Sequence, residues 1–196
     1  MAKRRAVFLD RDGTINVERE FLHLPAEFEF IPGAPQAIRL LNDAGFLVIV
    51  VTNQSGVARG YYDESAIGRL HRHLDAELAR FGAAIDGYYF CPHHPEHGTG
   101  NQGKLCECRK PRAGMLFKAA KDFSLDLAVS YLIGDKQADV EAGLLAGCRP
   151  ILVRTGYGAA ESAKLPADIP VYDNLLKAVR AIVDENQVDR VKADGF

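Results

Sequence analysis

The chain has 196 residues, of which 47% are hydrophobic and 26% are charged, and its formal net charge at pH 7 is −2. This length and apolar content allow one substantial core, whereas two full domains would be cramped. The nearly balanced charge argues against a nucleic-acid-binding protein, which needs a concentrated basic face. No apolar run is long enough for a membrane span or a secretory signal, so we expect a cytoplasmic protein that does not bind membranes.

Short apolar runs alternate with helical patterns along the chain. The runs indicate buried strands at residues 6–9, 46–51, 85–90, 130–133 and 149–153. Helical patterns are found at 34–43, 63–81, 112–123, 137–146 and about 174–185. This alternation predicts an α/β fold with a single Rossmann-like parallel sheet and helices on both faces. Asp63 is a plausible N-cap of the second helix, on which His71 and His73 are expected to face solvent.

The first predicted strand ends in two carboxylates one residue apart. Val7-Phe8-Leu9 is followed by Asp10-Arg11-Asp12-Gly13-Thr14. In open α/β sheets, ligand sites form at the carboxyl edge of the strands. A carboxylate at this edge can be a nucleophile, a metal ligand or both; the plain alternative is a strand that ends in an Asx turn.

Three further segments place polar side chains where the same edge is expected. The second strand leads into Thr52-Asn53-Gln54-Ser55-Gly56, whose hydroxyl and amide groups suit phosphate oxygens. Arg109-Lys110-Pro111 precedes a helix, with Pro expected at its first position and Lys110 near its positive N-terminus. The fourth strand runs into Gly134-Asp135-Lys136. Taken singly, these segments could be polar turns or a solvated basic pair.

Electrostatics favours a single site for these groups. Asp10 and a phosphate dianion about 4 Å apart would repel each other by roughly 8 kcal/mol at an effective dielectric near 20. A Mg²⁺ held by Asp10, Asp135 and a backbone carbonyl would offset this repulsion, with help from Lys110 and Lys136.

In order and spacing, the four segments resemble the haloacid dehalogenase-like phosphatases, and the resemblance covers nearly the whole chain. It implies that Asp10 is the nucleophile of a phosphoaspartyl intermediate. Asp12 would be the general acid/base that protonates the leaving alkoxide and later activates water, so it must hold a proton near neutral pH. Thr52 and Lys110 would stabilise the phosphoryl group.

The same resemblance implies the metal ligands. Asp135 would be the second carboxylate ligand of Mg²⁺, and Asp12 would contribute its backbone carbonyl. Asp139, four residues after Asp135, is expected to support the water shell of the metal or Lys136. A charge at a helix N-terminus is the alternative for Asp139.

Residues 91–109 interrupt the strand and helix alternation and are rich in Cys, His, Gly and Pro. Cys91 with His93 and Cys106 with Cys108 form two close pairs of the kind that binds tetrahedral Zn²⁺. Because protein groups would fill all four positions, the zinc should be structural. A disulfide from Cys91, or free thiols, is the alternative.

The zinc would stabilise a loop that has no core of its own, and it would position Arg109 and Lys110 directly behind it. His94 and His97 are substitute candidates for the histidine ligand. Cys148 follows a helix and is expected to belong to the core.

Two groups of haloacid dehalogenase-like phosphatases resemble this chain in having such a zinc loop and no large cap domain: the heptose bisphosphate phosphatases and the histidinol-phosphate phosphatases. Residues 10–17, 52–60 and 89–95 are close to the first group, although Glu20-Phe21-Leu22 departs from its usual Gly-Tyr-Val. We therefore expect Mg²⁺-dependent removal of the C7 phosphate of a heptose 1,7-bisphosphate, for lipopolysaccharide or related glycans. The alternatives are a histidinol-phosphate phosphatase and an inert zinc-stabilised binding module.

The phosphate that stays on a sugar bisphosphate needs cationic recognition, which arginine supplies by bidentate contact. The residues expected to bind the substrate are Glu18, Arg19, Glu20, Phe21, Asn53, Gln54, Ser55, Arg59, Arg109 and Lys136. We expect a monomer with one phosphatase domain over residues 1–186 and a charged tail over 187–196.

Overall fold

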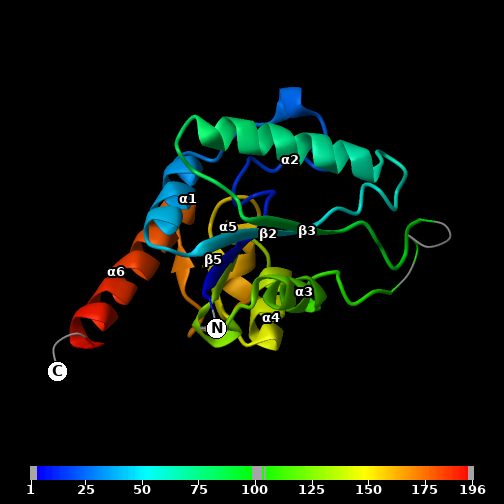
Figure 1. Ribbon diagram of the computed structural model, residues 1–196. Helices are drawn as coiled ribbons and strands as arrows, with labels where there is room; N and C mark the ends of the chain where they lie inside the picture. Colours follow the sequence, from blue (N-terminus) through cyan, green and yellow to red (C-terminus); the bar gives the residue numbers. More distant parts are fainter. Residues whose placement is uncertain (1–3, 99–102, 104, 194–196) are drawn as a thin grey trace.

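The computed structural model describes residues 4–98, 103 and 105–193. Six parallel strands form one sheet in the order β3-β2-β1-β4-β5-β6 (Figure 1). The strands are β1 (Ala6–Leu9), β2 (Leu47–Asn53), β3 (Gly87–Cys91), β4 (Tyr131–Gly134), β5 (Arg149–Val153) and β6 (Val171–Tyr172). Because β2 and β4 flank β1 on opposite sides, the strand order reverses at β1, where ligand sites of such sheets form.

Helices cover both faces of the sheet, as predicted (Figure 1). One face carries α1 (Ala34–Asp43), α2 (Glu64–Ala79) and α6 (Leu175–Ala193), and the other carries α3 (Gly114–Phe123) and α4 (Gln137–Ala146). The shorter elements are α5 (Gly158–Glu161) and 3-10 turns at Pro25–Glu27, Leu127–Val129 and Ser162–Lys164.

Strand β1 shows why this sheet needs continuous apolar runs. Its side chains alternate between the two faces, and each face is covered by helices. Val7 and Leu9 pack in the core cluster that includes α1, α2 and α6, whereas Ala6 and Phe8 pack in the cluster that includes α3 and α4. All four are fully buried.

Two predictions about helix α3 are wrong, and one short strand was not predicted. Helix α3 begins at Gly114 rather than at 112, because the chain first makes a turn in which the Arg112 amide donates to the Arg109 carbonyl at 2.9 Å. Pro111 is therefore not the first helical residue. The two-residue strand β6 was not predicted, because so short a segment has no readable alternation.

The last helix is longer than predicted. Helix α6 continues from Leu175 to Ala193 instead of ending near residue 185. The separate status of residues 187–196 as a tail stays a prediction. Among the described residues, no helix is both long and apolar enough to cross a membrane.

The expectation that His71 faces solvent is also wrong. This side chain is only 7% exposed, and its ring stacks on Tyr88 with 4.2 Å between ring centres. Its Nε2 lies 3.5 Å from Nη1 of Arg11. Burial lowers the pKa of His71 to about 3, so the ring is neutral. The N-cap prediction is confirmed, since Asp63 accepts a hydrogen bond from the Ala66 amide at 2.9 Å.

Candidate active site

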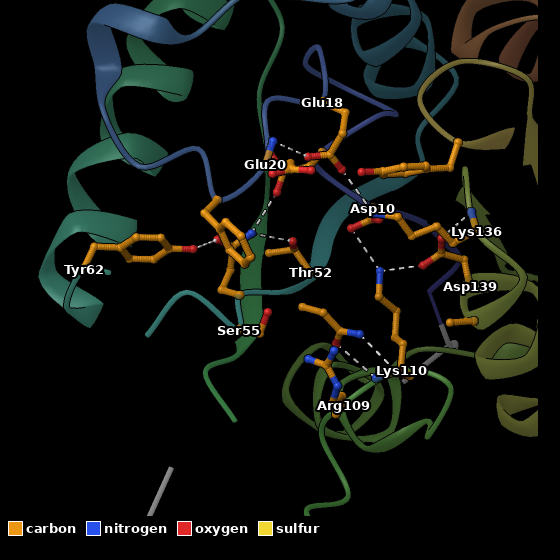
Figure 2. Close-up of a pocket in the computed structure, with 16 residues that line it drawn as sticks. Asp10, Glu18, Glu20, Thr52, Ser55, Tyr62, Arg109, Lys110, Lys136 and Asp139 are labelled. Atoms are coloured by element: carbon orange, nitrogen blue, oxygen red, sulfur yellow. Dashed lines mark hydrogen bonds and ion pairs between the residues drawn. The ribbon is translucent and has the colours of Figure 1, made fainter. Parts of the chain in front are cut away.

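The carboxyl ends of the central strands open into a cavity of about 390 Å³ (Figure 2). Twelve residues predicted for the site line it: Asp10, Asp12, Glu18, Glu20, Phe21, Thr52, Asn53, Gln54, Ser55, Arg109, Lys110 and Lys136. The lining also includes Tyr62, Ala138, Asp139 and Tyr157.

Two predicted substrate-binding arginines do not line this cavity. Arg19 pairs with Glu29 at 2.6 Å, and both side chains are largely exposed. Arg59 lies beside the cavity wall, with its guanidinium carbon 5.5 Å from the ring centre of Phe21.

Lys110 is the buried cation of the cavity. Its Nζ lies 3.0 Å from Oδ1 of Asp10 and 2.5 Å from Oδ1 of Asp139, and it donates to the Val51 carbonyl at 2.7 Å. Burial alone would lower the pKa of Lys110, but the two carboxylates raise it above its ordinary value. Lys110 is therefore charged and neutralises part of the negative charge around Asp10.

The side chain of Asn53 holds the backbone of Lys110 by two hydrogen bonds. Its side-chain Nδ2 donates to the Lys110 carbonyl at 3.0 Å, and its Oδ1 accepts from the Lys110 amide at 3.1 Å. Strand β2 thus sets the position of Lys110 across the cavity, although the two residues are far apart in the sequence.

Three buried carboxylates meet beside Lys110. Asp10, Asp135 and Asp139 each offer an oxygen, and these oxygens lie within 4.8 Å of one another. Within the described part of the chain, Oδ1 of Asp135 is buried without a hydrogen-bond partner. Burial, followed by the charge of Asp10, raises the pKa of Asp135 to about 8. An unpartnered buried oxygen among like charges suits a cation, and an all-oxygen ligand set suits Mg²⁺.

Asp139 is already engaged by the protein. Its Oδ2 accepts from the backbone amide of Lys136 at 3.0 Å, which caps helix α4, and its Oδ1 pairs with Lys110. The side chain of Lys136 instead pairs with Glu18 at 3.2 Å and lies 4.8 Å from the ring centre of Tyr157.

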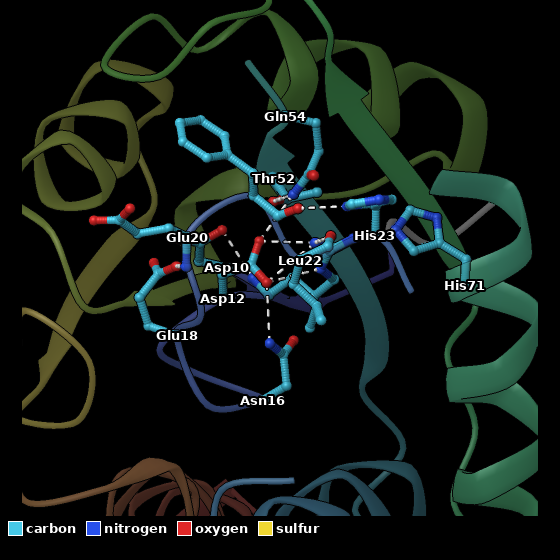
Figure 3. A network of polar contacts seen from close by, with 12 residues as sticks. Asp10, Asp12, Asn16, Glu18, Glu20, Leu22, His23, Thr52, Gln54 and His71 are labelled. Atoms are coloured by element: carbon cyan, nitrogen blue, oxygen red, sulfur yellow. Dashed lines mark hydrogen bonds and ion pairs between the residues drawn. The ribbon is translucent and has the colours of Figure 1, made fainter. Parts of the chain in front are cut away.

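The carboxylate of Asp12 faces three donors (Figure 3). Arg11 donates to both of its oxygens at 2.9 to 3.2 Å, Asn16 donates at 3.0 Å and Gln54 at 2.9 Å. Burial alone would raise the pKa of Asp12, but the charge of Arg11 and these hydrogen bonds lower it. Asp12 is therefore ionised in the free protein, and the acid role expected for it would require that it gains a proton.

The two Cys and His pairs converge in one cluster. The sulfurs of Cys91, Cys106 and Cys108 lie 3.2 to 3.5 Å apart, and Nδ1 of His93 lies 3.3 Å from the sulfur of Cys108. A disulfide bond is about 2.0 Å long, whereas sulfurs around a tetrahedral zinc lie about 3.8 Å apart. The separations exclude a disulfide here, and the donor set fits Zn²⁺.

The cluster is joined to the cavity through Arg109. Its Nη1 donates to the carbonyl of His93 at 3.2 Å, and its side chain lines the cavity. His94 and His97 stand apart from the four clustered residues, and their rings contact each other at 4.5 Å.

Three contributors to the site were missed by the sequence reasoning. Tyr157 follows β5 and could have been found by the strand-end argument applied to the other strands. Arg11 is fully buried although it lies between two carboxylates that were singled out. Tyr62 has no signal in the sequence that distinguishes it from its neighbour Tyr61.

A family model described as "HAD-hyrolase-like" matches residues 107–178. The D-glycero-beta-D-manno-heptose-1,7-bisphosphate 7-phosphatase of Haemophilus ducreyi is 44% identical over 168 residues, which cover 85% of this chain and 92% of that protein. The enzyme of the same name from Escherichia coli K12 is 44% identical over 164 residues, covering 83% and 86% respectively.

Solved structures agree with these relatives. The D,D-heptose 1,7-bisphosphate phosphatase of B. bronchiseptica, complexed with magnesium and phosphate, matches with a TM-score of 0.84 and 36% identity. The match covers 92% of this chain and 99% of that one. The corresponding protein of Burkholderia thailandensis matches with a TM-score of 0.69 and 33% identity, with the same coverage.

Proposed function

This chain belongs to the D-glycero-beta-D-manno-heptose-1,7-bisphosphate 7-phosphatase family of haloacid dehalogenase-like hydrolases, and we propose that it removes the C7 phosphate of that sugar bisphosphate through an aspartyl phosphate on Asp10. The observation that supports this best is the position of Asp10. It directly follows strand β1, with Lys110 Nζ at 3.0 Å and the carboxylates of Asp135 and Asp139 beside it. A nucleophile, a neutralising cation and a cation site thus meet in one cavity.

In the first step, a carboxylate oxygen of Asp10 attacks phosphorus, and the ester bond to the sugar oxygen breaks. Lys110 and Thr52 stabilise the phosphoryl oxygens by charge and hydrogen bonding. Asp12 gives its proton to the departing alkoxide. The negative charge of a bound phosphate ester raises the pKa of Asp12 and thereby favours the proton that this step needs.

In the second step, Asp12 acts as the base. It takes a proton from a water molecule that attacks the phosphorus of the aspartyl phosphate, and the bond to the Asp10 oxygen breaks. Inorganic phosphate and the free carboxylate of Asp10 result. The low pKa of Asp12 in the free protein suits this second role.

We assign the Mg²⁺ ligands to the side chains of Asp10 and Asp135 and the backbone carbonyl of Asp12. When bound, Mg²⁺ would supply positive charge between Asp10 and the phosphate. Zn²⁺ would be held by Cys91, His93, Cys106 and Cys108 and would be structural.

Gly13 provides a test of the Asp135 assignment. It has φ of +82°, and a Cβ there would lie 2.2 Å from Oδ2 of Asp135. Gly13→Ala should therefore displace Asp135, weaken Mg²⁺ binding and lower kcat/KM at limiting Mg²⁺ by about tenfold or more. A Mg²⁺ titration of activity measures both effects.

Gly45→Ala is the matched control. Gly45 has a similar φ of +78°, but nothing lies within 4 Å of its added Cβ. Both substitutions cost about 1 kcal/mol or more of backbone strain, and only the one at Gly13 should change the Mg²⁺ dependence. Equal Mg²⁺ dependence in the two variants would contradict the Asp135 assignment.

The cations of the cavity support a bisphosphate substrate. Arg109 and Lys136 line the cavity and can bind the phosphate that is retained, with Arg59 beside the wall. Phe21, Glu18 and Glu20 line the side where the sugar hydroxyls would lie. Histidinol phosphate carries an amine instead of a second phosphate, so these cations would contribute less to its binding.

Steady-state kinetics on three substrates tests the proposal: both anomers of the heptose 1,7-bisphosphate, and histidinol phosphate. We expect the β-anomer to have the highest kcat/KM, because the relatives are named for it, and histidinol phosphate to be at least about tenfold poorer. A higher kcat/KM for histidinol phosphate would show that the substrate is wrongly assigned.

A further inference from the structure

A buried glutamine joins Asp12 to Thr52. The side-chain Nε2 of Gln54 donates to Oδ2 of Asp12 and to Oγ1 of Thr52, both at 2.9 Å. Gln54 is only 2% exposed, so water does not substitute readily for either contact. Both side-chain N–H groups of Gln54 therefore donate to residues that take part in the proposed mechanism.

Tyr62 holds the other end of the same amide. Its hydroxyl donates to Oε1 of Gln54 at 2.8 Å, and Figure 2 shows its ring reaching toward the cavity from the segment before α2. A Cβ on Gly56 would lie 2.3 Å from the Tyr62 ring, so the ring packs directly on backbone. With its carbonyl oxygen bonded to Tyr62, the amide of Gln54 turns its nitrogen toward Asp12.

The ring of Tyr62 also contacts the loop that lines the sugar side of the cavity. His23 stacks on Tyr62 with 4.7 Å between ring centres and 16° between planes. Nδ1 of His23 lies 2.9 Å from the carbonyl oxygen of Phe21, and Phe21 lines the cavity. Tyr62 therefore lies between this loop and Gln54.

We propose that Tyr62 is a positioning residue that acts through Gln54 to hold the carboxylate of Asp12 where it can protonate the leaving group. This inference rests on the proposed function, because it requires Asp12 to be the acid. As the bond from Asp10 to phosphorus forms, the ester bond breaks and the proton on Asp12 passes to the departing oxygen. A displaced carboxylate slows this transfer and leaves the charges around Asp10 unchanged.

The dependence of kcat/KM on the leaving group distinguishes a positioning role of Tyr62 from a general structural effect of its substitution. A sugar alkoxide is strongly basic and needs the proton, whereas nitrophenolate is weakly basic and departs without it. kcat/KM covers the steps up to phosphorylation of Asp10. For Tyr62→Phe we expect kcat/KM to fall about tenfold with the heptose bisphosphate and less than about twofold with p-nitrophenyl phosphate.

Tyr61→Phe is the matched control. It removes a hydroxyl from the neighbouring residue, which is 57% exposed and contacts Phe21 through its ring. This variant should leave kcat/KM for both substrates within about twofold of the unmodified protein. An equal loss on both substrates in Tyr62→Phe would indicate a merely structural role and overturn the inference, as would an unchanged kcat/KM.

Asp12→Asn separates this inference from the proposed function. This variant should also lower kcat/KM more for the heptose bisphosphate than for p-nitrophenyl phosphate, and its loss with the heptose bisphosphate should be larger than that of Tyr62→Phe. If it lowers kcat/KM equally for both substrates, the acid role of Asp12 fails and the inference fails with it. If Asp12→Asn discriminates between the substrates and Tyr62→Phe does not, the inference alone is wrong.

The route through Gln54 has its own test. In a Gln54→Ala background, adding Tyr62→Phe should lower kcat/KM for the heptose bisphosphate by less than about twofold further, because coupled residues are not additive. A further tenfold loss would show that Tyr62 acts without Gln54, contrary to the proposal. Thermal unfolding of each variant verifies that it is folded.

Discussion

Asp10→Asn should lower kcat by at least about 10⁴-fold while the protein stays folded. The amide has the shape of the carboxylate, so it fits at the end of β1 beside Lys110, but it cannot attack phosphorus. Lys110 keeps its ion pair with Asp139, so no buried charge is left alone. Steady-state kinetics and the thermal unfolding midpoint measure the two effects together.

A trapping experiment tests the same prediction directly. After an acid quench during turnover, mass spectrometry of the unmodified protein should find phosphate on the peptide that contains Asp10, and the variant should carry none. Asp139→Asn is the control, because it perturbs Lys110 and leaves the nucleophile in place; it should slow phosphorylation without abolishing it. Phosphate on a different side chain, or more than about 1% residual turnover in Asp10→Asn, would refute the mechanism.

Cys106→Ala should remove zinc and destabilise the protein. Residues 91–109 contain few apolar side chains, so a metal bound by the four-residue cluster would be a main source of stability for the segments that carry the ligands. Losing a ligand of a structural zinc costs several kcal/mol. We expect the thermal unfolding midpoint to fall by about 10 °C. We also expect KM for the bisphosphate to rise, because Arg109 is held by the carbonyl of His93.

Cys148→Ala provides the comparison. Cys148 is buried, whereas Cys106 is only partly buried, and Cys148 lies outside the four-residue cluster and packs in the core beside α4. This variant should keep its zinc and its KM and lose only the packing of one thiol. Zinc content is measured by elemental analysis after gel filtration. Unchanged zinc content in Cys106→Ala would reject the zinc assignment.

The edge of the sheet that carries the site could be predicted because it depends on a local pattern. Asp10, Thr52 and Asp135 each follow a buried apolar run, and the carboxyl ends of parallel strands meet at one edge. The sheet and its two helical layers follow from the same runs, because a strand covered on both faces must be apolar at every position.

The four candidate zinc ligands could be predicted for a similar reason. The spacing between Cys91 and His93 and between Cys106 and Cys108 puts two donors at each end of one loop, and such a loop is stabilised by closing around a metal. The spacing does not indicate how this loop contacts the rest of the protein. The hydrogen bond from Arg109 to His93 appears only in the folded chain.

The fold class, the strand edge of the site and the composition of the Cys and His cluster could be predicted from the order of the amino acids, because each depends on which residue types follow one another. The folded chain was needed to see that Arg11 is buried against Asp12, that Asn53 holds the backbone of Lys110, and that Arg19 lies outside the cavity. It also placed Tyr62 against Gln54. This is because the burial of a polar side chain depends on hydrogen-bond partners from distant segments of the chain, and a local sequence pattern does not indicate those partners.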